Sequence, residues 1–417
     1  MSSVIGKIVR GEFTPHKDIE TDAQVLRLTC GTHTCHHIYP TMRSTTSDGM
    51  FLLHFRELGR RRQLYAMNLE TGDSLQLTSG RDVDDYHAAF SCDDRHIFFL
   101  QANTIWKMDA LNLIREELYR PRGDWKVREF NFTDDDRYMV TCEVLAGGYE
   151  VSLSGLTDWS TFALDSLRAP RNRIVLIDLQ SGEASVLVDE ECWLGRPCFR
   201  PGDPTTIMYC HEGPYDMIDA RMWLVQSDGT GKRCCRSQDN DTVLTSEFWF
   251  PDGSELGFLC WRPHSDEAEE LHAIDPVTLE ERTVCTCPAY AHCAVGPNGK
   301  LIVGDALSTN DPVHIHASAV SGRVSASGED DDFIYLSDLG TGEAIRLCHH
   351  GSSYLPKYGR VFDSEPHPVF SRDGRSIIYV SDAEGRPSIY RVKLARFLWE
   401  RAAKRDESYA YGITATF

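Results

Sequence analysis

Short runs of apolar residues recur along the chain, and each run follows a turn built around Asp-Gly, Asn-Gly or a related pair. The first copy has its turn at residues 46–49, an apolar strand at 50–55 and a second strand at 63–67. Asp-Gly and Asn-Gly are typical of tight hairpins, because Gly and Asn adopt a positive φ at little steric cost. The pattern therefore predicts short antiparallel strands joined by turns.

This pattern of a turn followed by two strands occurs seven times. Its period is about 40 to 50 residues where no insertion intervenes, as blades of four short strands require. It predicts an all-β fold, a seven-bladed β-propeller that forms a single domain over residues 1–417, with a tail over 394–417. We expect residues 24–28 to add a closing strand that links the first blade to the last, because closure leaves no exposed sheet edge. The expected blade starts lie near residues 44, 87, 129, 196, 246, 291 and 366.

Charge narrows the range of partners. Acidic residues outnumber basic ones by 63 to 43, which gives a formal net charge of −20. Most of such a surface repels phosphate backbones and anionic lipids, so neither nucleic acid nor a membrane is an expected partner. Residues 1–15 contain no apolar core of a secretion signal, and no segment has the length and apolar character of a membrane span, so we expect a cytoplasmic protein.

Three further features are expected to be structural. The 14 cysteines show neither a disulfide framework nor a paired zinc motif and are expected to be reduced. The basic run at residues 60–62 is expected to be a solvated loop of the first blade. Helical spacing at residues 394–405 indicates a small packing helix or a subunit contact, so a homo-oligomer stays open.

Polar residues at the blade starts are the candidates for a site, because the innermost strand of each propeller blade lines the central channel. His292 and His367 occupy this position in adjacent blades, and Glu365 lies on the same strand face as His367. Two imidazoles and a carboxylate suit a divalent metal such as manganese, with positions left for substrate oxygens. The alternative is that these side chains are hydrogen-bonded channel fillers, a common role for an isolated His.

A longer series of segments resembles the oligogalacturonate lyases, a family of intracellular seven-bladed propellers that cleave short pectin fragments by β-elimination. The resemblance covers nearly the whole chain and includes Cys-His-Glu-Gly-Pro at 210–214, Asp-Ala-Arg-Met-Trp at 219–223 and Pro-His-Pro at 366–368. It is also dense at residues 156–159, 193–195 and 247–249. The resemblance implies a manganese ion, held by three His and one Gln, that binds the uronate carboxylate. It further implies a separate His that removes the C5 proton and an Arg that neutralises the carboxylate.

Carried over position by position, the metal ligands of the family are partly present. His292 and His367 match two of the metal-binding His. Glu365 stands in place of the third His and can still bind a hard divalent cation. Phe362 stands in place of the Gln and cannot bind one. The resemblance thus implies an altered metal site.

The catalytic positions of the family also differ in part. Arg221 matches the neutralising Arg, and Arg196 adds a second cation where the family has a His. Ser246 replaces the proton-abstracting His and cannot act as an unassisted base near neutral pH. If elimination is retained, His211 is the first candidate for the base, with His36 and Tyr215 behind it. We expect four residues to contact the substrate: Arg196, His36, Tyr215 and Ser246.

Three functions are compatible with these residues. Arg221 and Arg196 favour a lyase that acts on short, anionic uronic-acid oligosaccharides with manganese or another divalent metal. The changes at Ser246 and Glu365 favour an eliminase for a different sugar, such as a keto-glycoside, or a propeller without catalytic activity. In the last case the ligand would be an oligosaccharide or a protein, and the missing base is the main support.

Overall fold

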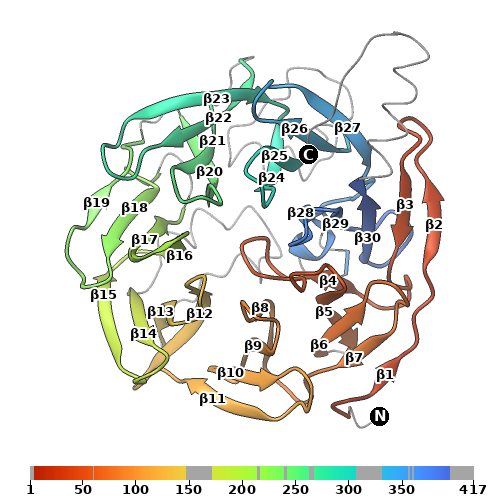
Figure 1. Cartoon of the computed structure of the whole chain (residues 1–417), viewed down its shortest axis with the longest axis horizontal. Helices are drawn as coiled ribbons and strands as arrows, with labels where there is room; N and C mark the ends of the chain where they lie inside the picture. The colour runs from red at the N-terminus through yellow and green to blue at the C-terminus, as the bar shows by residue number, and fades with distance from the viewer. Residues whose placement is uncertain are drawn as a thin grey trace.

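Seven antiparallel sheets form a ring around a central axis, as Figure 1 shows. The computed structural model describes residues 4–59, 61–146, 171–213, 217–238, 242–262, 267–306, 331–355, 357–358 and 361–394. Five sheets have four strands and two have five. The predicted seven-bladed β-propeller is thereby confirmed. Within these described ranges, no helix is long and apolar enough to cross a membrane.

The strands of each blade follow one another from the axis outwards. Blade one contains β4 (Cys35–His37), β5 (Phe51–Leu58), β6 (Arg61–Asn68), β7 (Ser74–Gln76) and β1 (Ile8–Val9). Blade two contains β8 (Val83–Phe90), β9 (His96–Gln101), β10 (Thr104–Asp109) and β11 (Arg115–Tyr119). Blade three contains β12 (Trp125–Phe132), β13 (Tyr138–Leu145), β14 (Asn172–Asp178) and β15 (Ala184–Glu190). Blade four contains β16 (Leu194–Arg200), β17 (Asp203–His211), β18 (Met222–Gln226) and β19 (Arg233–Cys234).

The remaining three blades follow the same order. Blade five contains β20 (Val243–Trp249), β21 (Leu256–Trp261), β22 (Glu269–Ile274) and β23 (Glu281–Cys287). Blade six contains β24 (Tyr290–Val295), β25 (Leu301–Ala306), β26 (Phe333–Asp338) and β27 (Ala344–His349). Blade seven contains β28 (Val369–Phe370), β29 (Ser376–Ser381), β30 (Ser388–Lys393), β3 (Gln24–Arg27) and β2 (Thr14–Lys17), and the short 3₁₀ helix η4 (Val361–Ser364) precedes it.

The N-terminal segment closes the ring. β3 pairs with β30 of the last blade, β2 pairs with β3, and β1 pairs with β7 of the first blade. This arrangement confirms the closing strand that was expected at residues 24–28. The first blade begins earlier than residue 44, because β4 already pairs with β5 at its inner edge. Of the tail over 394–417, only Leu394 lies in the described part of the chain.

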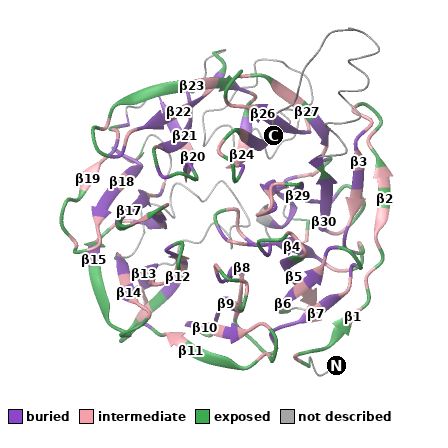
Figure 2. Cartoon of the chain, viewed as in Figure 1, coloured by how far each residue is buried: buried purple, intermediate pink, exposed green. Residues whose placement is uncertain are grey.

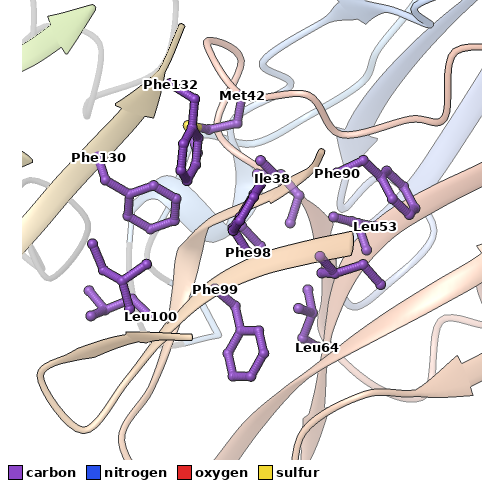
Figure 3. Close-up of a cluster of buried hydrophobic side chains, with 14 of the residues drawn as sticks. Ile38, Met42, Leu53, Leu64, Phe90, Phe98, Phe99, Leu100, Phe130 and Phe132 are labelled. Atoms are coloured by element: carbon purple, nitrogen blue, oxygen red, sulfur yellow. The ribbon is translucent and has the colours of Figure 1, made fainter. Parts of the chain in front are cut away.

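The core lies between neighbouring blades rather than inside any one of them. Figure 2 shows buried residues on the middle strands, and exposed residues on the outer strands β11, β15 and β23. One cluster joins blades one, two and three through Leu53, Phe98 and Phe130, and is drawn in Figure 3. Phe98 stacks on Phe132 with their ring centroids 4.2 Å apart. Interdigitated faces of this kind hold the blades at fixed angles around the axis.

Most inner strands carry a β-bulge near the middle of the ring. The register shifts in β8, β12, β16, β20 and β24, at Val83/Ala88, Val127/Glu129, Gly195/Cys198, Thr245/Phe248 and Tyr290/His292. Arg196, Ser246 and His367 have positive φ values of 53°, 54° and 43°, which are uncommon for residues with a side chain. A bulge re-aims a side chain out of the regular alternation and is frequent next to active sites. The bulges therefore mark the level of the ring at which a site is expected.

His54 on β5 gives the stability a pH dependence. It is buried, its Nε2 lies 3.1 Å from Ser74 Oγ, and burial lowers its pKa to about 3. Between about pH 6.5 and 3 the unfolded chain takes up a proton at this residue and the folded chain does not. The wild type should thus lose about 1.4 kcal/mol of unfolding free energy per pH unit in this window from His54 alone. Urea unfolding of His54→Gln should show a pH slope that is smaller by this amount, and equal slopes would contradict the assignment.

Candidate active site

His292, Glu365 and His367 converge where blades six and seven meet at the axis. Glu365 Oε2 lies 3.6 Å from His292 Nε2 and 3.5 Å from His367 Nε2. The two imidazole centroids are 3.9 Å apart. One ligand atom from each of the three residues falls within 4.8 Å of the others, so a single cation could contact all three. The structure brings together the three metal-type residues that the sequence singled out.

The Oε2 atom of Glu365 is the strongest indication that these residues suit a cation. It is buried and makes no hydrogen bond to the described residues. Burial raises the pKa of Glu365 to about 7. An unpartnered buried carboxylate oxygen is costly unless a cation or a proton compensates it. Two imidazoles and one carboxylate, with room for further ligands, form a donor set that suits divalent metals such as manganese or iron.

A second layer of groups orients His292. Its Nδ1 lies 3.0 Å from Asp305 Oδ2, and its backbone N–H donates to Asp305 Oδ1 at 3.0 Å. Tyr354 donates its hydroxyl to the same carboxylate at 2.7 Å. Burial acts to raise the pKa of Asp305, but His292, the Tyr354 hydroxyl and His350 together outweigh it and lower that pKa. When an ionised carboxylate accepts the proton of His292 Nδ1, the lone pair of Nε2 is left to bind a metal. This is the usual arrangement around a metal-binding His.

Arg196 and Arg221 form a closed ion-pair network with two buried carboxylates. Arg221 Nε donates to Glu247, and its Nη1 lies 3.1 Å from Glu212 Oε2. Arg196 lies 3.3 Å from the carboxylate of Glu212 and 3.2 Å from that of Glu247. Burial acts to raise the pKa of Glu247, but Arg221 and Arg196 outweigh it and lower that pKa. These contacts use Nε and Nη1 of each guanidinium.

Tyr39 connects this network to the metal-type residues. The guanidinium of Arg196 lies 5.9 Å from the Tyr39 ring centroid, and the His367 ring lies 6.1 Å from it. The His87 ring lies 6.3 Å away on another side. These groups therefore occupy one layer around the axis, at the level of the bulges.

His87 and Asp84 form a dyad that the sequence analysis did not identify. His87 Nδ1 lies 3.0 Å from Asp84 Oδ1, and within the described chain His87 Nε2 has no hydrogen-bond partner. Burial acts to lower the pKa of His87, but the Asp84 carboxylate outweighs it and raises that pKa. His87 lines a cavity of about 310 Å³ together with Arg196, Glu129 and residues of β20 and β24. The sequence Asp-Asp-Tyr-His at the start of the second blade was the available signal.

Ser246 lies at the bulge of β20, and its hydroxyl is hydrogen-bonded to the thiol of Cys293. No described imidazole replaces the family His at this point of β20. The side chain of Phe362 in η4 is outside the described part, so its predicted inability to bind a metal stays a prediction.

His36 is buried, and both of its ring nitrogens have a hydrogen-bond partner. Its Nδ1 lies 3.1 Å from the carbonyl oxygen of His37, and Arg62 Nη1 donates to its Nε2 at 3.0 Å. Burial and the Arg62 charge lower the pKa of His36 well below its ordinary value. The interpretation of residues 60–62 as a solvated loop was wrong for Arg62, which pairs with Asp85 at 2.9 Å and Asp363 at 2.5 Å. Residue 60 is outside the described chain.

His211 lies apart from the Arg221 network. His211 ends β17, and the following Glu212 side chain reaches Arg221, whereas the imidazole of His211 stacks on Trp223 with a centroid distance of 4.9 Å. Its Nε2 faces Glu190 Oε2 at 3.0 Å. Successive side chains of a strand point to opposite faces, which accounts for this separation. The role of His211 as a base stays a prediction, and Tyr215 lies outside the described residues.

The fold and site define a β-propeller with a metal-type triad and an arginine pair at its axis. The sequence profile of the oligogalacturonate lyases matches residues 4–397, and the chain belongs to this family. It is 30% identical to the oligogalacturonide lyase of Pectobacterium atrosepticum over 93% of this chain and 97% of that protein.

Solved structures agree with this membership. A structure described as oligogalacturonate lyase in complex with manganese has a TM-score of 0.84 and 31% identity, covering 95% of this chain and all of that one. A second oligogalacturonate lyase, from Vibrio parahaemolyticus, has a TM-score of 0.83 and 30% identity, covering 94% and 98% of the two chains.

Proposed function

We propose that this protein cleaves short oligogalacturonates by β-elimination with the help of a bound divalent cation, manganese being the first candidate. One observation carries the proposal, namely the unpartnered Oε2 of Glu365 beside His292 and His367. It favours an enzyme of this family over a binding propeller, which has no need of a buried carboxylate oxygen without a hydrogen bond. The similar protein of known structure that contains manganese supports the same choice.

The chain supplies local positive charge for an anionic substrate. The net charge of −20 opposes an oligogalacturonate over most of the surface. Arg196 and Arg221 can each offer one guanidinium edge to a uronate carboxylate while Glu212 and Glu247 hold the rest of each group in place. Bidentate or paired guanidinium contacts are strong and directional toward carboxylates. A bound divalent cation would add Lewis-acid stabilisation of the charge that develops next to that carboxylate.

We further propose that His87 accepts the C5 proton in place of the base that is missing at Ser246. Asp84 on Nδ1 fixes the tautomer that leaves Nε2 free, as a general base requires. His87 and Arg196 line the same cavity, and Glu129 accepts the Arg196 backbone N–H at 2.7 Å between them. His36 is less suited, because Arg62 occupies its Nε2.

The reaction class can be tested by product mass. Trigalacturonate is incubated with the protein and manganese, and the products are weighed by mass spectrometry. Elimination gives two products whose masses add up to that of the substrate, one of them carrying a C4–C5 double bond. Products whose summed mass exceeds the substrate by one water would show hydrolysis and overturn the proposal.

Removal of the metal is expected to lower turnover of oligogalacturonate at least about 100-fold, because the cation contributes several kcal/mol of charge stabilisation. Glu365→Gln should weaken manganese binding, since it keeps the shape of the side chain and removes its charge. The measurements are metal content, manganese affinity and turnover of chelated and reloaded protein. Full turnover in protein shown to be free of metal would contradict this prediction.

A further inference from the structure

A second cluster of metal-type residues lies away from the axis, where blades three and four meet. Glu190 ends β15, Cys192 lies in the segment that leads to β16, and His211 ends β17. His211 Nε2 is 3.0 Å from Glu190 Oε2, and the Cys192 thiol donates to the same oxygen at 3.6 Å. One ligand atom from each residue lies within 4.8 Å of the others.

The spacing of these atoms suits one small cation. Zinc–sulfur, zinc–nitrogen and zinc–oxygen bonds of about 2.3, 2.0 and 2.1 Å place tetrahedral ligand atoms roughly 3.4 to 3.6 Å apart. The observed sulfur–oxygen distance of 3.6 Å agrees with this value, and the nitrogen–oxygen distance of 3.0 Å requires only a small outward shift. The three donors therefore need little rearrangement to bind an ion.

His211 Nε2 points to a missing partner. The atom is buried and makes no hydrogen bond of acceptable geometry to the described residues, although Glu190 lies beside it. Trp223 stacks on the ring and fixes its orientation, with an angle of 22° between the planes. Lys232 pairs with the other oxygen of Glu190 and so turns Oε2 toward Cys192 and His211. The Glu190 and His211 side chains are 21% and 20% exposed, which leaves an ion access from solvent.

We propose that Glu190, Cys192 and His211 bind a thiophilic divalent cation, zinc being the first candidate, and thereby clamp blade three to blade four. Thiolate, imidazole and carboxylate are the three side-chain donors that zinc uses, and a water completes the tetrahedron. The Cys192 thiol loses its proton to solvent as the sulfur–metal bond forms. The site shares no residue with the triad at Glu365 or with the His87–Asp84 dyad, to which the proposed metal binding and proton transfer are assigned.

Cobalt(II) titration tests this site, because a cobalt–thiolate bond has a near-ultraviolet charge-transfer band and the triad at the axis contains no thiol. Metal-free full-length protein should develop the band with one equivalent of cobalt, and zinc should remove it. Cys192→Ser should lose the band, and His211→Asn should weaken binding at least about tenfold. Cys234→Ser, which changes another partly buried cysteine, should keep the band. His367→Asn should also keep it while losing the manganese site.

Absence of the band in wild-type protein at saturating cobalt would overturn the proposal, and would assign Glu190 and His211 to a simple ion pair. A band that persists in Cys192→Ser would overturn it as well. Thermal unfolding with and without zinc provides a second readout in a background without the triad: zinc should raise the midpoint of His367→Asn but not that of the double variant His367→Asn/Cys192→Ser. An equal rise in the double variant would contradict the site even if that variant were less stable.

Discussion

Replacing His87 with Asn is expected to lower kcat on oligogalacturonate by about 10²–10⁴-fold, because Asn cannot accept a proton in place of the His87 imidazole that lines the cavity. Manganese binding should change little, since His87 is not one of the three residues of the triad. The measurement is kcat and KM of both proteins with manganese saturated. His16→Asn, which changes a partly exposed His on β2, is the matched control and should keep wild-type turnover.

Asp84→Asn tests the role of Asp84 in orienting the proposed base, His87, independently of the base itself. Asp84 raises the pKa of His87, and the neutral imidazole is the active form, so turnover of the wild type should fall as the pH drops through that pKa. Without the carboxylate the pKa of His87 falls. The acid limb of the kcat profile should then move to lower pH while the plateau decreases. Wild-type turnover in His87→Asn, or an unmoved acid limb in Asp84→Asn, would remove His87 from the mechanism.

Arg221→Met is expected to destabilise the fold by about 3–5 kcal/mol, the usual cost of leaving a buried charge without its partner. Glu212 and Glu247 are both buried and both pair with Arg221. Turnover should fall as well, because one of the two guanidinium groups offered to the substrate carboxylate is removed. Urea unfolding measures the first effect and kcat/KM the second.

A matched double variant shows whether the unbalanced charge causes the loss of stability in Arg221→Met. Glu247→Gln in the Arg221→Met background should recover part of the lost stability, because it removes the excess negative charge that Arg196 alone cannot balance against Glu212 and Glu247. Glu247→Gln alone should destabilise the protein, since Arg196 and Arg221 then lose a shared partner. A loss below about 1 kcal/mol in Arg221→Met would show that the network is solvated and contributes little.

The fold could be predicted because its signals are local and repeated. Turn residues at the start of each blade set the strand boundaries. The closing strand expected at residues 24–28 is present as β3, which pairs with β30 of the last blade. The triad was also predictable from its position at the starts of two adjacent blades, although Glu365 and His367 lie in the segment that leads to β28 and not on a strand as expected, whereas His292 is on β24.

The remaining site residues depend on distances that the sequence does not contain. Arg62 lies on β6 of blade one and is half-buried, and its partners Asp85 and Asp363 come from distant parts of the sequence. Asp84 and His87 are three residues apart but meet because β8 bulges between Val83 and Ala88. A bulge shifts the alternation of side chains and so defeats an argument from strand period alone.

The most direct test of the lyase assignment is ultraviolet absorbance during incubation of metal-free and manganese-loaded protein with di- and trigalacturonate, because the unsaturated uronide absorbs and the substrate does not. We expect a steady rise with the loaded protein and almost none with the metal-free protein. A flat trace from protein shown to contain stoichiometric metal would contradict it.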